Sequence, residues 1–302
     1  CERVVQETAG KKGIIGFAIP STRHAPVHHN KYMRLYRMIE ETGMPVSFHA
    51  GYHWDDPSLK TVNRFLGMHA LGFAWPNIVH CTNWVLNGMP VRFPKLKVIW
   101  IESGLAWLPF MIQRLDNEYL MRSSECPSLK KLPGEYITDM YYTSQPMEIP
   151  RDMSLLESTF KCIKADSQLL YSSDYPHWDF DLPSTIYDLP FLSEQGKRNI
   201  LGLNAARVFN LKVERKRPNA RDVLAASPDR PISFGVFSDD FAEMERQARE
   251  FPAGSYMLGT SAAGKVDTLY RRVTMTIAQM VDYFGFQNVS REVQDNYNNS
   301  HL

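Results

Sequence analysis

Chemistry is most clearly indicated in the stretch Leu169–Asp179, which reads LLYSSDYPHWD. It begins as a short apolar run typical of a buried strand, and serine and proline residues then break it, so that Asp174 falls where the strand ends. In a barrel of alternating strands and helices, the carboxyl ends of the strands face the active site, and polar groups placed there usually take part in the reaction. Asp174 could instead cap the helix that follows, because aspartate is a good N-cap residue.

A second strand ends in a polar residue in the same way. The stretch Pro45–Gly51 reads PVSFHAG, and its small Ala-Gly turn leaves room beside the ring of His49. A single histidine is more often a packed core residue than a ligand, so the interpretation of His49 depends on Asp174. Two strands that end in histidine and aspartate favour an active site over two unrelated structural roles.

Several stretches between Lys12 and Leu211 resemble the amidohydrolase-2 family, in particular its branch that includes aminocarboxymuconate semialdehyde decarboxylase and resorcylate decarboxylase. They read PVSFHAG, RFPKLKVIWIESGLAWLPFMIQRLD, YYTSQPME, LLYSSDYPHWD and NILGLNAARVFNL. The resemblance implies an α/β fold, a (β/α)8 barrel of the TIM type, whose metal-binding mouth carries His49 and Asp174.

The resemblance also implies roles for other residues near strand ends. Glu102 or Ser103 stands near the position at which decarboxylases of this family present a histidine close to the metal, and Glu102 is expected to act as a general base or to hold a ligand by a hydrogen bond. The expected site residues are Asp174, Glu102 and His177 as catalytic groups, His49 and Asp174 as metal ligands, and His53, Trp54, Ser103 and Gln145 in contact with substrate.

Imidazole and carboxylate ligands suit zinc best, with manganese, iron or magnesium as alternatives. A divalent ion can polarise a substrate oxygen or lower the pKa of a bound water molecule. The first action suits decarboxylation of a small carboxylic acid, such as an aromatic one, and the second suits hydrolysis with Asp174 accepting the proton of the water. The sequence therefore predicts a metal-dependent lyase or hydrolase and leaves the choice between them open.

The elements that must position these residues are strands followed by helices. Such units recur five times, which predicts a parallel sheet with helices outside it. The expected strands are Gly13–Pro20, Pro45–His49, Lys97–Gly104, Met140–Thr143 and Leu169–Asp174.

A TIM barrel has eight strands, and no His-x-His pair ends an apolar run in this sequence. Five units alone would leave two open sheet edges, which a protein in water rarely tolerates. We therefore expect the remaining strands to come from a second chain or from a preceding segment of a precursor, with a homo-oligomer as an alternative. The competing hypothesis is a non-catalytic or half-site structural subunit of a hetero-oligomer.

The character of the chain changes after residue 211. Residues 1–211 are expected to form the C-terminal part of the barrel, residues 212–231 a charged linker, and residues 232–302 an extension with amphipathic helices. Helices are expected at Asp239–Phe251 and Val266–Phe284. The apolar stripe of the second helix predicts an assembly contact, although packing on the barrel is the alternative.

Composition excludes several classes of function. A net charge of +1, from 34 basic and 33 acidic residues, gives no electrostatic case for binding nucleic acid or an acidic membrane. No apolar run approaches the roughly 20 residues that span a bilayer. The four scattered cysteines are typical of reduced thiols in a cytoplasmic protein.

Overall fold

The computed structural model describes residues 1–20, 25–49, 51, 56–175, 177, 179–213, 231–238, 255–260 and 266–276. The chain divides into two compact units. The first comprises Cys1–Asp174 and Asp179–Val213, and the second includes Glu214–Leu302.

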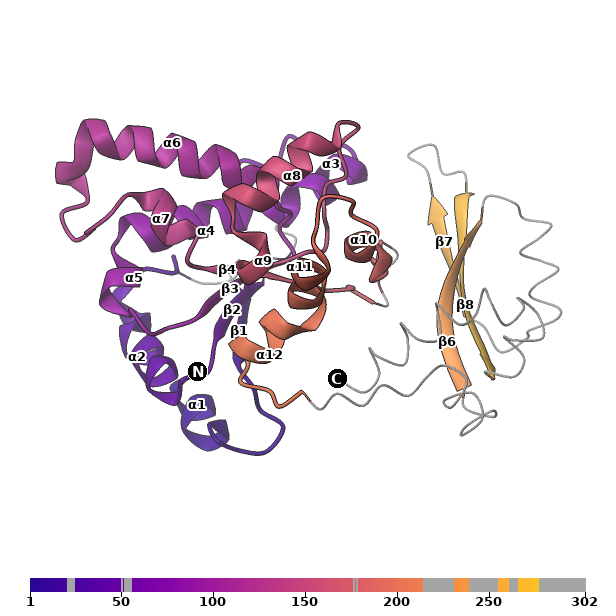
Figure 1. Cartoon of the computed structure of the whole chain (residues 1–302), viewed down its shortest axis with the longest axis horizontal. Coiled ribbons are helices and arrows are strands. Elements are labelled where there is room, and N and C mark those ends of the chain that lie inside the picture. The colour runs from indigo at the N-terminus through magenta and orange to yellow at the C-terminus, as the bar shows by residue number, and fades with distance from the viewer. Residues whose placement is uncertain are drawn as a thin grey trace. The chain divides into compact units, whose positions relative to one another are not determined.

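The first unit is built on a parallel sheet of five strands that lie side by side in the order of the chain (Figure 1). The strands are β1 (Phe17–Pro20), β2 (Val46–His49), β3 (Val98–Ile101), β4 (Tyr141–Thr143) and β5 (Leu169–Leu170). All four pairings are parallel, and Pro20, His49 and Ile101 lie level with one another at the carboxyl ends of β1, β2 and β3. The predicted α/β fold with five strand–helix units is confirmed.

In the first unit, one or more helices follow each strand of the parallel sheet (Figure 1). The α-helices are α1 (Glu2–Thr8), α2 (Met33–Thr42), α3 (Phe65–Gly72), α4 (Ala74–Leu86), α5 (Met89–Arg92), α6 (Trp107–Arg122), α7 (Pro133–Ile137), α8 (Met153–Cys162), α9 (Ala165–Gln168), α10 (Ser184–Tyr187), α11 (Glu194–Arg198) and α12 (Asn204–Val208). Short 3-10 turns cover Asn30–Tyr32 and Ser123–Glu125, and a π-helical turn, Asn199–Leu203, joins α11 to α12. Among these described helices, none is both long and apolar enough to cross a membrane.

The core lies between one face of the sheet and the helices. Phe48 of β2 stacks on Trp100 of β3 at 5.0 Å between ring centroids, and it also contacts Tyr36 of α2 and Trp84 of α4. Because successive side chains in a strand point to opposite faces, Ile99 lies on the other face. There it packs with Leu170 and Val208 in a separate apolar cluster.

Glu148 fixes the turn between β3 and α6. Its Oε2 accepts hydrogen bonds from the backbone N–H groups of Leu105 (2.8 Å) and Ala106 (3.1 Å), which are free donors at the start of the helix. Gly104 has a φ of +70°, and a Cβ at this position would collide with the Glu148 carboxylate. The turn therefore needs both a glycine and this carboxylate.

Substituting Glu148 with alanine is expected to lower the free energy of unfolding by about 1 kcal/mol, because two charge-assisted bonds to the helix start are lost. Urea denaturation would measure the change. The matched control is Glu118→Ala, which removes an exposed pair with Arg114 at 3.4 Å and should cost less than about 0.5 kcal/mol. Equal losses in the two variants would contradict the capping role.

The second unit contains an antiparallel sheet in the order β6-β8-β7, formed by β6 (Pro231–Ser238), β7 (Ser255–Thr260) and β8 (Val266–Thr276). The helix expected at Val266–Phe284 is therefore wrong for its first eleven residues, Val266–Thr276, which form a strand. Valine, threonine and tyrosine are frequent in this stretch, and these residues favour strands over helices. The linker residues 214–230 and the expected helix Asp239–Phe251 lie outside the described residues.

Candidate metal centre

Histidine and carboxylate side chains meet at the carboxyl ends of the parallel strands. His49 is the last residue of β2, and Glu102 directly follows β3. The Nε2 atom of His49 lies 2.5 Å from Oε2 of Glu102, whose carboxylate is largely buried. The parallel register of β2 and β3 brings these two residues together, because it makes their carboxyl ends level.

Asp174 and His177 complete a group of candidate metal ligands with Glu102. Each of the three offers one ligand atom, and these atoms all lie within 4.8 Å of one another. Convergent nitrogen and oxygen donors from separate segments of the chain are what a divalent cation requires. The structure thus brings together the three residues expected to be catalytic, and His49 contacts one of them, Glu102.

Both carboxylate residues of this group have a left-handed backbone. The φ angles are 57° at Glu102 and 56° at Asp174, values that residues other than glycine rarely adopt. At Glu102 the backbone N–H donates to Oγ1 of Thr143 on β4, at 3.0 Å. Unfavourable backbone at two site residues is typical of functional positions.

Serine hydroxyl groups join the ends of β4 and β5. The backbone N–H of Ser172 donates to Oγ of Ser144, and that of Gln145 donates to Oγ of Ser172, both at 3.0 Å. These bonds continue the sheet past the two residues of β5 and fix the start of the segment that carries Asp174.

The residues expected to contact substrate are placed less clearly. Ser103 is buried, and its carbonyl accepts a hydrogen bond from Nε1 of Trp107 at 2.8 Å. Gln145 is also buried, and its side-chain amide donates to Asp179. Substrate contact at these two positions stays a prediction, and His53 and Trp54 lie outside the described residues.

Sequence reasoning missed two groups beside the site. His69 of α3 packs between Phe65 and Phe73, and its Nε2 atom lies 3.4 Å from Oδ2 of Asp179. Burial, with the negative charges of Asp179 and Asp174, raises the pKa of Asp181 to about 6 against an opposing hydrogen bond from Thr185. His69 and Asp179 are 110 residues apart, so spacing in the sequence gives no signal for their contact.

The sequence profile of the amidohydrolase family matches residues 5–211. The chain belongs to the amidohydrolase family. The match covers the whole five-stranded parallel sheet and each residue of the candidate metal centre, so the resemblance identified from the sequence motifs is confirmed.

Solved decarboxylases share the fold of this amidohydrolase. The structure of 5-carboxyvanillate decarboxylase from Sphingomonas paucimobilis is 21% identical, with a TM-score of 0.56 over 70% of this chain and 63% of that one. The 2,6-dihydroxybenzoate decarboxylase from Rhizobium is 19% identical, with a TM-score of 0.56 over 70% and 67% of the two chains. The dihydroxybenzoic acid decarboxylase from Polaromonas sp. JS666, solved with manganese and 2-nitroresorcinol, is 21% identical, with a TM-score of 0.53 over 70% and 64%. The amidohydrolase chain thus spans less than two thirds of the first of these proteins.

The C-terminal part of the chain matches a different kind of protein. Residues 235–301 match the profile of the bacteriophage head to tail connecting protein. A stretch of 49 residues is 49% identical to the portal protein of Salmonella phage epsilon15, which is 16% of this chain and 9% of the portal protein. The similarity of this segment is therefore separate from that of residues 5–211.

The raised pKa of Asp181 predicts a pH-dependent stability for the amidohydrolase unit. Its pKa is about 6 in the fold against 3.8 for an unperturbed group, so the folded state holds the proton more tightly. The resulting stabilisation is complete below about pH 4 and is lost as the pH rises through 6. Asp181→Asn is therefore expected to raise the free energy of unfolding by about 1–2 kcal/mol at pH 8, after allowance for solvent screening of a half-buried group, and by little at pH 4.

Chemical denaturation at the two pH values, with a chelator present, would measure this difference. The control Glu157→Gln neutralises a carboxylate that pairs with Lys161 at 2.6 Å on the surface of α8, and it should show no such gain at pH 8. An equal response of Asp181→Asn at both pH values would disprove the prediction.

Proposed function

We propose that the chain is a metal-dependent lyase that removes the carboxyl group of a small, aromatic hydroxy acid. The observation that carries the proposal is the convergence of Glu102, Asp174 and His177 at the strand ends, with His49 in contact with Glu102. The manganese in a decarboxylase of the same fold supports manganese as the first ion to test, with zinc as the second.

The residues of the site would divide the work as follows. Asp174 and Glu102, together with His49, would hold a divalent ion, which when bound would supply Lewis-acid polarisation of the substrate oxygens. Glu102 would keep the imidazole of His49 oriented through their 2.5 Å contact. His177, an exposed member of the group, would donate a proton to the carbon atom that loses the carboxyl group.

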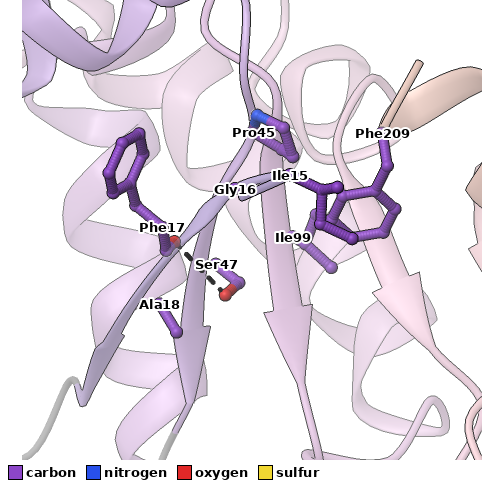
Figure 2. Close-up of a pocket in the computed structure, with 8 residues that line it drawn as sticks. All are labelled: Ile15, Gly16, Phe17, Ala18, Pro45, Ser47, Ile99 and Phe209. Atoms are coloured by element: carbon purple, nitrogen blue, oxygen red, sulfur yellow. Dashed lines mark hydrogen bonds between the residues drawn. The ribbon is translucent and has the colours of Figure 1, made fainter. Parts of the chain in front are cut away.

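Completion of the sheet by a second chain is part of this proposal. In the part of the chain that the structure describes, β1 pairs with β2 alone. A pocket of about 200 Å³ opens beside it (Figure 2). The pocket is lined by Ile15, Gly16, Phe17, Ala18, Pro45, Ser47, Ile99 and Phe209. An extended segment with apolar side chains would both pair with β1 and fill this pocket.

Direct measurement of metal and product tests the proposal. The purified chain would be loaded with Mn²⁺ or Zn²⁺, analysed for bound metal by mass spectrometry, and assayed for release of CO₂ from 2,6-dihydroxybenzoate and 5-carboxyvanillate. Native mass spectrometry of the same sample would report any second chain. Metal binding with CO₂ release supports a lyase. Absence of bound metal, both in this chain alone and in any complex with a second chain, would reject the proposed lyase. Hydrolysis of amide or ester substrates without CO₂ release would favour the hydrolase alternative.

A second candidate function concerns residues 235–301. Their match to the head to tail connecting protein favours a structural role in an assembly, as a non-catalytic subunit or as an assembly contact of an enzyme. Truncation after Leu211 with native mass spectrometry of both forms would test it, since an unchanged assembly size would reject the contact. The four free cysteines support a cytoplasmic location for either function.

A further inference from the structure

The segment that carries Asp174 is a closed loop. It leaves β5 at Tyr171, and the backbone N–H of Asp181 donates to the carbonyl of Ser173 at 2.8 Å. The hydroxyl of Tyr171 donates to the carbonyl of Asp181, also at 2.8 Å. Two bonds therefore bring the far end of the loop back to its start, beside the left-handed residue Asp174.

Within this loop, Asp179 makes contacts with two other elements. The side-chain amide of Gln145, directly after Ser144 at the end of β4, donates to the Asp179 carbonyl at 3.1 Å and lies 3.4 Å from its Oδ2. The Nε2 atom of His69 on α3 lies 3.4 Å from the same Oδ2. The carboxylate of Asp179 therefore joins the loop to β4 and to α3.

Both partners of Asp179 are themselves held in place. Gln145 is 1% exposed, and its backbone N–H donates to Oγ of Ser172. The ring of His69 lies between Phe65 and Phe73, at 5.7 and 5.8 Å between centroids. A carboxylate that contacts two side chains held in this way is restrained, and it restrains the loop that contains it.

We propose that Asp179 is a positioning residue, which fixes the loop so that Asp174 and His177 converge on Glu102. The proposal deepens the proposed metal-dependent function and rests on it for its purpose. Asp174 is five residues from Asp179 and His177 is two. Loss of the carboxylate would remove the contacts of Oδ2 with Gln145 and His69 and so loosen the loop, while the group of Glu102, Asp174 and His177 stays chemically intact. Residues that orient metal ligands in this way usually change metal affinity by about 10–100-fold.

The test uses the full chain with three variants. Asp179→Ala removes the carboxylate, and His69→Phe removes one donor while keeping an aromatic ring between Phe65 and Phe73. Glu194→Ala is the control, since it removes an exposed carboxylate that pairs with Lys197 at 3.3 Å. Two quantities are measured: amide hydrogen exchange of residues 171–181 in metal-free protein, and the dissociation constant of Mn²⁺ by electron paramagnetic resonance.

In Asp179→Ala, amide exchange of the loop is expected to be faster and Mn²⁺ binding about 10–100-fold weaker, while exchange of β3 stays as in the unchanged protein. In Glu194→Ala, both loop exchange and Mn²⁺ affinity should equal those of the unchanged protein. His69→Phe should show the same two effects at smaller size, which keeps the test valid if Asp179→Ala does not fold. Unchanged exchange in the loop, or unchanged Mn²⁺ affinity, overturns the proposal. If the unchanged protein binds no Mn²⁺, the proposed function fails by itself, and loop exchange alone then decides for or against the positioning role.

Discussion

Replacement of Asp174 with alanine is expected to weaken Mn²⁺ binding by roughly 100-fold or more, a larger effect than loss of an outer residue produces. Asp174 provides one of the three ligand atoms that lie within 4.8 Å of one another, and the change leaves a single carboxylate, Glu102, in that group. Titration followed by electron paramagnetic resonance would measure the affinity. The charge of Asp174 also helps to raise the pKa of Asp181, so that pKa should fall in the variant.

Asp174→Asn separates the charge of this residue from its backbone conformation. Asparagine tolerates the left-handed region about as well as aspartate does, so the φ of 56° is retained without the negative charge. This variant should fold as stably as the unchanged protein in the presence of chelator and still bind Mn²⁺ poorly. Full metal occupancy in both variants would show that the ion binds elsewhere.

Substituting Trp100 with alanine is expected to lower the free energy of unfolding by about 3–5 kcal/mol. Trp100 is 1% exposed in the middle strand of the sheet, it stacks on Phe48, and its Nε1 donates to the sulfur of Met140 at 3.3 Å. Its removal leaves a cavity between the sheet and the helices, which the flanking strands cannot close without shifting. Urea denaturation would measure the loss.

Trp75→Ala is the matched control for this prediction. Trp75 lies in the first turn of α4 and is 40% exposed, so much of the ring is in contact with water in the folded state. Its removal should cost less than about 1 kcal/mol. Similar losses at Trp75 and Trp100 would mean that the face of the sheet that carries Trp100 is not the core.

The sequence was informative where short apolar runs end abruptly. Val46–Phe48 and Val98–Trp100 are buried, as such runs predict, and a polar residue of the candidate site follows each of them, His49 directly and Glu102 after Ile101. At Val266–Thr276 the helix predicted from the spacing of apolar residues was wrong. Apolar residues there happen to recur at helical spacing, while pairing with β6 and β7 satisfies the backbone in an extended form that valine and threonine favour.

The candidate site could be predicted only in part, because its geometry depends on contacts between distant segments. The histidine of β2 and the aspartate after β5 stand out through their place at strand ends. The left-handed backbone at Glu102 has no mark in the sequence, and its N–H bonds to Thr143 on a neighbouring strand 41 residues further along the chain. The contact of Asp179 with His69 likewise follows from how α3 packs, which no periodicity reveals.

The strand order of the first unit also bears on how the protein emerges from the ribosome. Because β1 to β5 lie in the order of synthesis, each strand can pair with one that has already been made, and no place in this sheet waits for a later strand. His49 and Glu102 can thus come together early, whereas Asp174 arrives only with the fifth strand. The nascent chain would pass through a stage with a folded sheet of four strands and only His49 and Glu102 of the candidate site, which would be complete only after Asp174 and His177 are made.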